Sequence, residues 1–381
     1  MKFKPESYFL EKSLETPILI LELPRIRSKW ADFKNLFGSF SDIFYAVKAC
    51  PDPEVLRFLI GAGSNFDLAS VGELDLVLSL GADPRKCSFG NTIKKERDIE
   101  YFYSKGVRLF STDSFSDVEK LARKAPGADI FCRILVDAKS AEWPLSKKFG
   151  CDGSIASAVL IEAKTLGLNP VGVSFHPGSQ QTDLTAWDEA FDSVREIFQE
   201  LEKEGVTLSL VNVGGGYPGT YQKTTPDLQS YASNIRANLR KLPRGTRAMI
   251  EPGRGLVADA GTLISEVVMV SDKGDKGLPW CFVDIGKFGG LAETLDESIK
   301  YRLEFFNKHG EALGRTRKAI LAGPTCDSAD ILYEKNPVTI PELLESGSYL
   351  SIRSTGAYTT SYSSVGFNGF KPLEVKVVDY E

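Results

Sequence analysis

The chain has 381 residues, of which 46 are Lys or Arg and 51 are Asp or Glu, so its formal net charge is −5, and 42% of its residues are apolar. This apolar share excludes wholesale disorder. The slight acidity argues against a nucleic-acid partner, because there is no excess positive charge to displace counterions. The length indicates two domains, or one large barrel with an appendage.

The N-terminal segment MKFKPESYFLEKS has no apolar run suited to a signal peptide, and no stretch of about 20 apolar residues follows. We therefore expect a cytoplasmic protein without a membrane partner. Six cysteines without a Cys-x-x-Cys pair suit a reducing compartment, and they are Cys50, Cys87, Cys132, Cys151, Cys281 and Cys326. With only two histidines, the sequence predicts no metal site.

Eight short β-branched or aromatic segments alternate with segments whose apolar residues recur at spacings of three and four. This pattern predicts strands that alternate with amphipathic helices such as PEVLRFLIGAG and LTAWDEAFDSVREIFQELEKEG. The predicted strands are IFYAVK (43–48), NFDLAS (65–70), CSFGN (87–91), RLFSTD (108–113), IFCRILV (130–136), VGVSFH (171–176), LSLVNVG (208–214) and AMIEPG (248–253).

Eight strand–helix units favour an α/β fold with a closed, TIM-like (β/α)8 barrel over residues 22–256. An open doubly wound sheet is the alternative, but a count of eight fits closure better. Polar and glycine residues follow the predicted strands, and in such barrels the active site lies at that carboxyl-terminal rim.

After about residue 256 the pattern changes to successive β-strand segments: GTLISEVVMVSD, LPWCFVDIG, RKAILAGPT, SYLSIRS and LEVKVVDY. They predict a mainly β domain formed by residues 1–21 and 257–381. The run ILILELP (18–24) is either the first strand of this domain or the segment that leads into the barrel. LAETLDESIKY is expected to be a short helical connection.

Lys48, in FYAVKAC, is flanked by aromatic and aliphatic residues where a buried strand is expected. Lysine is rarely buried unless it is paired or functional. Burial would lower the pKa of its ammonium group and free a nucleophilic amine. Considered alone, Lys48 could equally be a strand-end lysine that reaches solvent.

A possible phosphate site lies at the end of the seventh predicted strand. Gly214, Gly215 and Gly216 follow the apolar run LSLVNV, and their backbone N–H groups could bind a phosphate, although a tight strand-to-helix turn also explains them. Arg254 follows the next strand, and neighbouring strand ends share one rim. The guanidinium and the glycines are therefore expected to meet around one phosphate.

Glu251 and His176 complete the predicted rim. A carboxylate at Glu251 could keep a pyridine nitrogen protonated, and His176, in SFHPGSQ, could stack on a flat ring. His176 alone would more often be a hydrogen-bonded core histidine. A lysine, a phosphate-binding turn, a carboxylate and an imidazole together are typical of a pyridoxal 5'-phosphate (PLP) site.

Motifs along nearly the whole chain resemble the PLP-dependent ornithine/diaminopimelate/arginine decarboxylase family, and the ornithine decarboxylases within it. They are FYAVKAC, FDLAS-x-x-E, SFGNTIK, WPLSKKFG, SFHPGSQ, GGGYPG, EPGRG, VDIGKFGGL, GPTCDSAD, GAYTTSYSS and FNGF. The resemblance implies an alanine-racemase-type (fold type III) barrel, and a homodimer in which the C-terminal domain of each subunit completes the active site of the other.

The resemblance also implies the roles of individual residues. It makes Lys48 the Schiff-base lysine, His176 the ring-stacking residue and Glu251 the partner of the pyridine nitrogen. It places phosphate contacts at Ser179, Gly214, Gly215, Gly216, Arg254 and Tyr358, and supporting residues at Asp67, Glu73 and Arg133. In the C-terminal domain it implies a catalytic Cys326, substrate-binding carboxylates at Asp284 and Asp327, and a substrate-contacting Phe367.

The implied reaction is decarboxylation of a basic amino acid, with L-ornithine converted to putrescine and CO2 in polyamine biosynthesis as the first choice. Lysine, both amino acids, or a modified diamino acid are alternatives. A racemase on the same fold and a non-catalytic paralogue that binds a regulator are less favoured, because Cys326 with Asp327 argues against the first and Lys48 with Glu251 against the second. Pro177 departs from the family, which usually has a small aliphatic residue after the histidine.

Overall fold

A computed structural model describes residues 3–136, 141, 148–274, 277–312 and 314–380. It divides the chain into two compact units. The barrel unit is Lys29–Pro218 with Thr225–Gly255, and the β unit is Met1–Ser28 with Gly219–Thr224 and Leu256–Glu381. Most of the motif WPLSKKFG, residues 143–147, lies outside the described residues.

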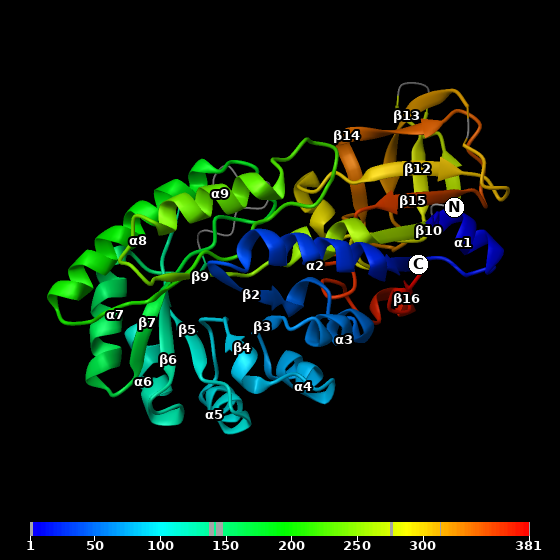
Figure 1. The fold of residues 1–381 in the computed structure, drawn as a ribbon. Helices are drawn as coiled ribbons and strands as arrows, with labels where there is room; N and C mark the ends of the chain where they lie inside the picture. Colours follow the sequence, from blue (N-terminus) through cyan, green and yellow to red (C-terminus); the bar gives the residue numbers. More distant parts are fainter. Residues whose placement is uncertain (1–2, 137–140, 142–147, 275–276, 313, 381) are drawn as a thin grey trace. The chain divides into compact units, whose positions relative to one another are not determined.

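The barrel unit contains a closed barrel of parallel strands, which confirms the predicted fold class (Figure 1). Each strand pairs with the next in chain order, and the last pairs with the first through the register Ser41↔Ala248. The strands are β2 (Ser41–Ala46), β3 (Asn65–Leu68), β4 (Cys87–Phe89), β5 (Leu109–Thr112), β6 (Asp129–Arg133), β7 (Asn169–Ser174), β8 (Leu210–Asn212) and β9 (Arg247–Ile250).

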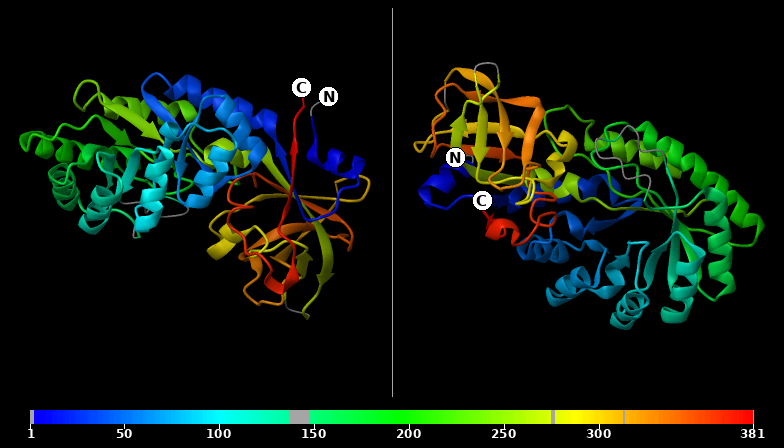
Figure 2. Two further views of the ribbon diagram at one scale, coloured as in Figure 1. Left: turned by 90° about the horizontal axis from the view of Figure 1, so that it is seen from below. Right: turned by 180° about the vertical axis from the view of Figure 1, so that it is seen from behind.

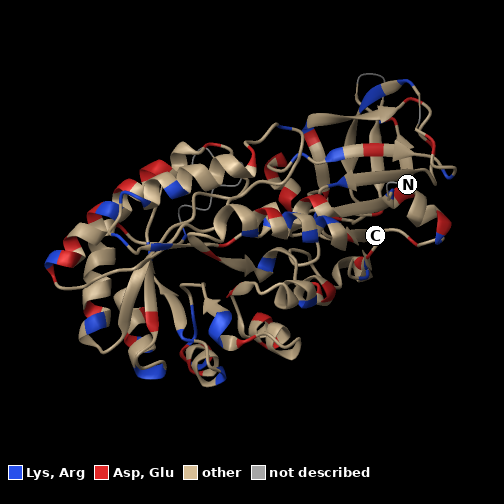
Figure 3. Cartoon of the chain, viewed as in Figure 1, with Lys and Arg blue, Asp and Glu red and all other residues tan. Residues whose placement is uncertain are grey.

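Helices connect successive strands and surround the barrel, as the two views of Figure 2 show. They are α3 (Pro53–Gly61), α4 (Val71–Ser79), α5 (Glu96–Lys105), α6 (Phe115–Lys124), α7 (Gly153–Thr165), α8 (Thr185–Lys203) and α9 (Leu228–Leu239). The helix α2 (Leu23–Phe37) precedes the first barrel strand, and the short α10 (Arg254–Val257) follows the last. On the outer helices Lys and Arg are interspersed with Asp and Glu (Figure 3).

The local sequence explains where these helices begin and which face they bury. Asp52 caps α3 by accepting hydrogen bonds from the backbone N–H groups of Glu54 and Val55, and Pro53 occupies the first helical position. In α8, Trp187 and Phe191 are buried one turn apart. This spacing forms the apolar stripe of a helix that packs on one side only.

The β unit contains an eight-stranded sheet with the order β12-β15-β10-β11-β13-β14, in which β1 pairs with both β10 and β16. Its elements are α1 (Pro5–Glu11), β1 (Ile18–Glu22), β10 (Gly261–Ser271), β11 (Trp280–Val283), β12 (Arg302–Phe306), β13 (Thr316–Ala322), β14 (Ile331–Pro341), β15 (Tyr349–Arg353) and β16 (Glu374–Val378). Residues 18–22 thus belong to the sheet. The segment LAETLDESIKY forms a 3-10 turn at Ala292–Glu297.

The sequence pattern does not predict two of these strands, β12 and β14. In β12 the charged Arg302 and Glu304 are exposed, so few apolar residues mark the strand. In β14 three consecutive exposed polar residues, Glu334, Lys335 and Asn336, interrupt the apolar pattern. Pairing with neighbouring strands decides their conformation, and this pairing is not visible in a local window.

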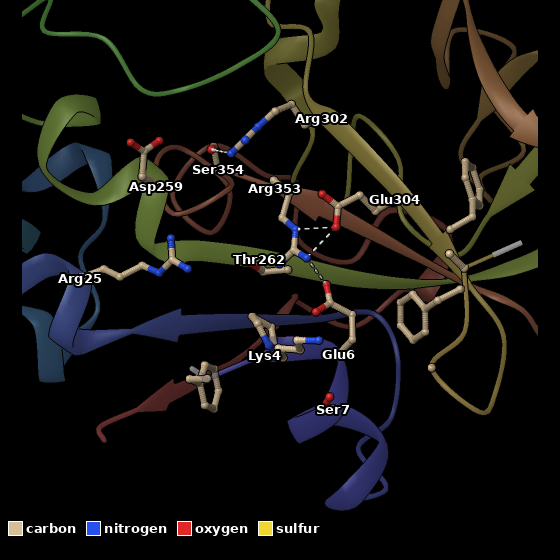
Figure 4. A pocket seen from close by; sticks show the side chains of 16 residues that line it. Lys4, Glu6, Ser7, Arg25, Asp259, Thr262, Arg302, Glu304, Arg353 and Ser354 are labelled. Atoms are coloured by element: carbon tan, nitrogen blue, oxygen red, sulfur yellow. Dashed lines mark hydrogen bonds and ion pairs between the residues drawn. The ribbon is translucent and has the colours of Figure 1, made fainter. Parts of the chain in front are cut away.

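An ion-pair cluster fixes the N-terminal helix α1 on the sheet of the β unit. Arg353 pairs with both Glu6 and Glu304, each at 2.6 Å, and the hydroxyl of Ser351 donates to Glu6 at 2.6 Å. Figure 4 shows Arg353 between the two carboxylates, beside a cavity of about 670 Å³. The Glu6 and Arg353 side chains are only 17% and 21% exposed. Among the described residues, no helix is long and apolar enough to cross a membrane.

Candidate active site

Lys48 and Asp67 form an ion pair where two neighbouring barrel strands end. β2 ends at Ala46, and Lys48 follows in a single 3-10 turn. Its Nζ lies 3.2 Å from Asp67 Oδ2, and the Ser88 hydroxyl donates to Asp67 Oδ1 at 3.2 Å. The expected burial of Lys48 in a strand is wrong: its side chain is 45% exposed, because the strand ends two residues earlier. The amine therefore lies at the carboxyl-terminal rim of the barrel.

His176 follows β7 on the same rim. Its Nδ1 accepts a hydrogen bond from the backbone N–H of Gly178 at 3.1 Å, which the intervening Pro177 does not prevent. Burial and then the nearby positive charge of Arg133 lower the pKa of His176 well below its ordinary value. The imidazole is therefore neutral, with its proton on Nε2. A Cβ on Gly215 would lie 3.3 Å from this nitrogen, so the ring faces the glycine turn.

Glu251 follows β9 and is held by Asn212 at the end of β8. The Asn212 Nδ2 donates to Glu251 Oε1 at 2.5 Å. Burial, reinforced by the charge of Asp67, raises the pKa of Glu251 to about 7. Lys48, Asn212 and Arg133 act in the opposite direction. The charge of this rim carboxylate therefore depends on pH near neutrality.

Arg133 ends β6 and brings positive charge to the rim. Burial lowers the pKa of Arg133, whereas the carboxylates of Glu251, Asp67 and Asp113 raise it. Its guanidinium lies 5.0 Å from the ring centroid of Phe149. The Arg133 guanidinium therefore offsets part of the negative charge that Asp67 and Glu251 bring to the rim.

The turn after β8 can be built only from glycine. Gly214 and Gly216 have φ values of +66° and +96°, a backbone conformation that disfavours other residues. At Gly215, a Cβ would lie 2.7 Å from the backbone oxygen of Glu251. Because the turn has no side chains, a ligand can approach its backbone groups directly.

A buried guanidinium lies on the same rim as this turn. Arg254 is 3% exposed and donates from Nε and Nη2 to the Ser179 hydroxyl at 3.2 and 3.1 Å. A guanidinium, a hydroxyl and a side-chain-free turn are the groups that commonly bind a phosphate dianion. These residues of the barrel unit therefore fit the phosphate of PLP.

Glu73 has a local structural role. The Ser70 hydroxyl accepts from the Glu73 backbone N–H at 3.3 Å, and the Glu73 carboxylate accepts from the Ala69 N–H at 2.7 Å. These bonds resemble a capping box, except that Glu73 accepts from the residue before the N-cap Ser70 instead of from Ser70 itself. Burial raises the pKa of Glu73. Glu73 thus fixes the turn that follows the strand of Asp67.

Four sequence-predicted residues cluster in the β unit. Asp284 and Phe367 line one cavity of about 410 Å³ together with Thr325. The backbone N–H of Cys326, beside Thr325, donates to Asn368 Oδ1 at 3.0 Å. Asp327 follows Cys326, and the side chains of both are exposed. The β unit therefore gathers the three segments that carry these residues.

The carboxylate of Asp284 is already hydrogen-bonded within the β unit. Its Oδ1 accepts from the Ser265 hydroxyl at 2.5 Å and from the Glu266 N–H at 3.0 Å. Burial raises the pKa of Asp284. Tyr358 lies in the same unit with φ of +60°. Its predicted contact with a phosphate stays a prediction.

Sequence reasoning missed two supporting residues, Asn212 and Asp330. Asn212 holds Glu251, and its Oδ1 accepts from the Gly214 N–H at 2.9 Å. Asp330 is 2% exposed and accepts from Lys287 N and the Thr325 hydroxyl, both at 2.8 Å. A polar residue at the end of the apolar run LVN, and the second aspartate of GPTCDSAD, are the signals that could have indicated them.

Residues 23–258, more than half of the chain, match the model of a protein family described as "Pyridoxal-dependent decarboxylase, pyridoxal binding domain". The chain belongs to the pyridoxal-dependent decarboxylases. This decarboxylase is 33% identical over 362 residues to the lysine/ornithine decarboxylase of Selenomonas ruminantium. The aligned region covers 95% of this chain and 89% of that protein. It is also 33% identical over 337 residues to ornithine decarboxylase 2 of Drosophila melanogaster, and this region covers 87% of this chain and 84% of that protein.

Solved structures have the same fold as the decarboxylase. The lysine decarboxylase from Selenomonas ruminantium superposes with a TM-score of 0.87 at 30% identity, covering 99% of this chain and 96% of that one. The lysine/ornithine decarboxylase from Vibrio vulnificus, complexed with cadaverine, superposes with a TM-score of 0.87 at 28% identity. The match covers 99% of this chain and 100% of that one. A mutant of a protein named SrLDC, in complex with PLP, superposes with a TM-score of 0.89 at 31% sequence identity. The match covers 99% of this chain and 96% of that one. PLP is the cofactor of this family, and the decarboxylase is a lyase.

Proposed function

We propose that this decarboxylase converts L-ornithine to putrescine and CO2, with L-lysine as a second substrate. The support is its similarity to proteins named ornithine decarboxylase and lysine/ornithine decarboxylase. Lysine is one methylene longer than ornithine, and one methylene discriminates by only about 1–3 kcal/mol in a pocket. Activity on both amino acids therefore fits these relatives.

The observation that carries the proposal is the group of side chains on the barrel rim. Lys48 is the amine that would bind PLP covalently, and Ser179, Arg254 and Gly214–Gly216 would hold its phosphate. His176 would lie against the pyridine face, with Asp67 and Arg133 as supporting charges. Bound PLP supplies an electron sink for the electron pair released with CO2.

Glu251 is the group that would keep a proton on the pyridine nitrogen. This task requires the carboxylate form, because a neutral carboxylic acid cannot stabilise the positive charge. The pKa of about 7 for Glu251, without PLP bound, leaves that form only partly populated at neutral pH. Asn212 favours the carboxylate by donating a hydrogen bond to it.

We propose that the β unit supplies the substrate-binding and proton-donating groups. Asp327 would bind the terminal ammonium of the substrate, with Asp284 as a second carboxylate, and Phe367 would contact its aliphatic chain. Cys326 would return a proton to the α-carbon. A substrate without a distal charge would leave Asp327 uncompensated, which disfavours neutral amino acids.

We further infer a cytoplasmic homodimer with two shared active sites, in which the β unit of one copy serves the barrel of the other. Residues 22–256 would form the cofactor-binding domain, in agreement with the matched range 23–258. Co-expression of Lys48→Ala with Cys326→Ala tests the sharing. Random pairing would restore roughly a quarter of the wild-type activity, because half of the dimers then carry one intact site. No recovery in a confirmed heterodimer would contradict shared sites.

The substrate assignment is tested by CO2 release from L-ornithine, L-lysine, L-arginine and D-ornithine with saturating PLP. We expect the highest kcat/KM for L-ornithine, and L-lysine within about 200-fold of it. Asp327→Asn should lower kcat/KM for L-ornithine by about tenfold or more, since it removes a charge-assisted contact. Arginine turnover equal to that of ornithine would overturn the assignment.

A further inference from the structure

Cys132 and Cys151 form a pair of thiols in direct contact next to the barrel rim. Cys132 lies on β6, and Cys151 lies two residues before α7. Their Sγ atoms are 3.8 Å apart. Cys132 is fully buried and Cys151 is 8% exposed. All six cysteines lie in the described residues and are free thiols, and no other two of them are in such contact.

The backbone holds the two thiols together. Cys151 N–H donates to the Arg133 carbonyl at 3.1 Å, and Leu135 N–H donates to the Cys151 carbonyl at 2.9 Å. Gly150 has φ of +94°, and a Cβ there would lie 2.8 Å from the Ile134 backbone. Only glycine permits this close approach. A β-bridge pairs Cys151 with Ile134, and Cys132 lies two residues before Ile134, on the same face of the extended chain, so the two sulfur atoms come into contact.

The two thiols differ in acidity and in access. The hydrogen bond between the two thiols lowers the pKa of Cys151, and the same bond together with burial raises the pKa of Cys132 well above its ordinary value. Cys151 is thus the more readily ionised and the more accessible thiol. A thiolate is the form that reacts with oxidants.

We propose that Cys132 and Cys151 are an oxidative modification site that forms an intramolecular disulfide with a hydroperoxide as oxidant. With hydrogen peroxide as this hydroperoxide, the Cys151 thiolate attacks one peroxide oxygen, the O–O bond breaks, a sulfenic acid forms, and the leaving hydroxide takes up a proton and departs as water. The Cys132 sulfur then attacks the Cys151 sulfur, the S–O bond breaks, and a second water leaves. In sum, the two thiols lose two protons and two electrons, and one hydrogen peroxide is reduced to two waters.

The disulfide would alter the rim through Arg133. A disulfide is about 2.05 Å long, so the sulfur atoms must approach by roughly 1.8 Å. Arg133 follows Cys132 and also accepts the hydrogen bond of Cys151, while its guanidinium contacts Phe149, two residues before Cys151. If Arg133 supports the cofactor, as proposed above, the dissociation constant of PLP should rise severalfold on oxidation and recover on reduction.

The test treats the PLP-loaded protein with hydrogen peroxide, blocks the remaining thiols with iodoacetamide, and analyses intact and digested protein by mass spectrometry. We expect an intact mass lower by two hydrogens before alkylation. We also expect a Cys132–Cys151 cross-linked peptide that dithiothreitol abolishes. A cross-link between other cysteines, or addition of two or three oxygens to Cys151 without a cross-link, would overturn the proposal.

Two variants separate this pair from general thiol oxidation. Cys132→Ser should abolish the cross-link and leave a sulfenic acid at Cys151 that reacts with dimedone. Cys87→Ser is the matched control, because Cys87 is a buried thiol on β4 without a thiol partner, and it should leave the cross-link unchanged. Mass analysis of the wild type decides the matter even if a variant does not fold. A cross-link in a protein without decarboxylase activity would refute only the proposed function.

Discussion

The side chains of Asn212 and Glu251 are joined by a hydrogen bond of 2.5 Å from Nδ2 to Oε1. The other end of the same amide accepts from the Gly214 N–H at 2.9 Å. One buried asparagine thus holds both the carboxylate and the start of the glycine turn. The position of the turn and the charge of Glu251 are therefore linked through a single side chain.

Replacing Asn212 with alanine should move the pH dependence of the reaction. Asn212 is one of the groups that lower the pKa of Glu251, so its loss raises that pKa. The active form is the carboxylate, and the acidic limb of kcat/KM should shift to higher pH. Activity at pH 7 should fall about tenfold, since a hydrogen bond to a charged group contributes about 1.5–3 kcal/mol.

The matched control is Asn238→Ala, which removes a buried asparagine of α9 that binds Asp188 instead. Its pH–rate profile should keep the wild-type acidic limb. An unchanged acidic limb in Asn212→Ala would show that this amide does not control Glu251.

Replacing Glu251 with glutamine should stabilise the PLP-free protein, but only at high pH. Folding raises the pKa of Glu251 from 4.5 to about 7, because burial disfavours its charge. The stability cost of ionising it is absent below pH 4.5 and fully present above pH 7. Urea unfolding should therefore give nearly equal stabilities at pH 4.5, and a variant more stable by up to about 3 kcal/mol at pH 8. An equal change at both pH values would contradict this origin.

Replacing Arg254 with methionine should weaken PLP binding. Arg254 is buried beside Ser179, and the loss of charge-assisted hydrogen bonds should raise the dissociation constant by about 100-fold. Absorbance titration with PLP measures this change. Arg247→Met is the control, because Arg247 begins the strand that precedes Arg254 and forms an exposed pair with Asp42. Equal losses in both variants would argue against a phosphate role for Arg254.

Replacing Glu6 with alanine should destabilise the β unit without affecting the chemistry. Glu6 pairs with Arg353 (Figure 4), and it accepts a hydrogen bond from the Ser351 hydroxyl in a mostly buried setting. Its loss should cost about 1–2 kcal/mol of unfolding free energy, measured by urea denaturation. Glu11→Ala is the control on the same helix, since the Glu11 side chain is 71% exposed. A Glu6 effect no larger than that of Glu11 would show that the ion-pair cluster at Arg353 does not stabilise the β unit.

The barrel could be predicted because its signals are local. Each strand is a short apolar run followed by polar or glycine residues, and amphipathic spacing marks the helices between them. The strands β12 and β14 lack such signals. Exposed charges such as Arg302 and Glu334 interrupt them, and only cross-strand pairing with β15 and β13 stabilises them.

The composition of the rim was predictable, but its geometry was not. Strand-end positions and family motifs indicated Lys48, His176, Glu251 and Arg254. The exposure of Lys48 depends on the strand ending at Ala46, and the role of Asn212 depends on a contact with a residue 39 positions away. Such contacts arise only when the barrel closes, and a short stretch of sequence carries no signal for this closure.

Release of labelled CO2 from carboxyl-labelled L-ornithine tests most directly whether the Lys48 amine carries the chemistry. Lys48→Ala should lose at least about 100-fold in rate while wild-type folding is retained in circular dichroism. Lys48→Arg is the control that keeps the charge beside Asp67 but lacks a nucleophilic amine, and it should fail equally. Release of CO2 by either variant at the wild-type rate would contradict the account.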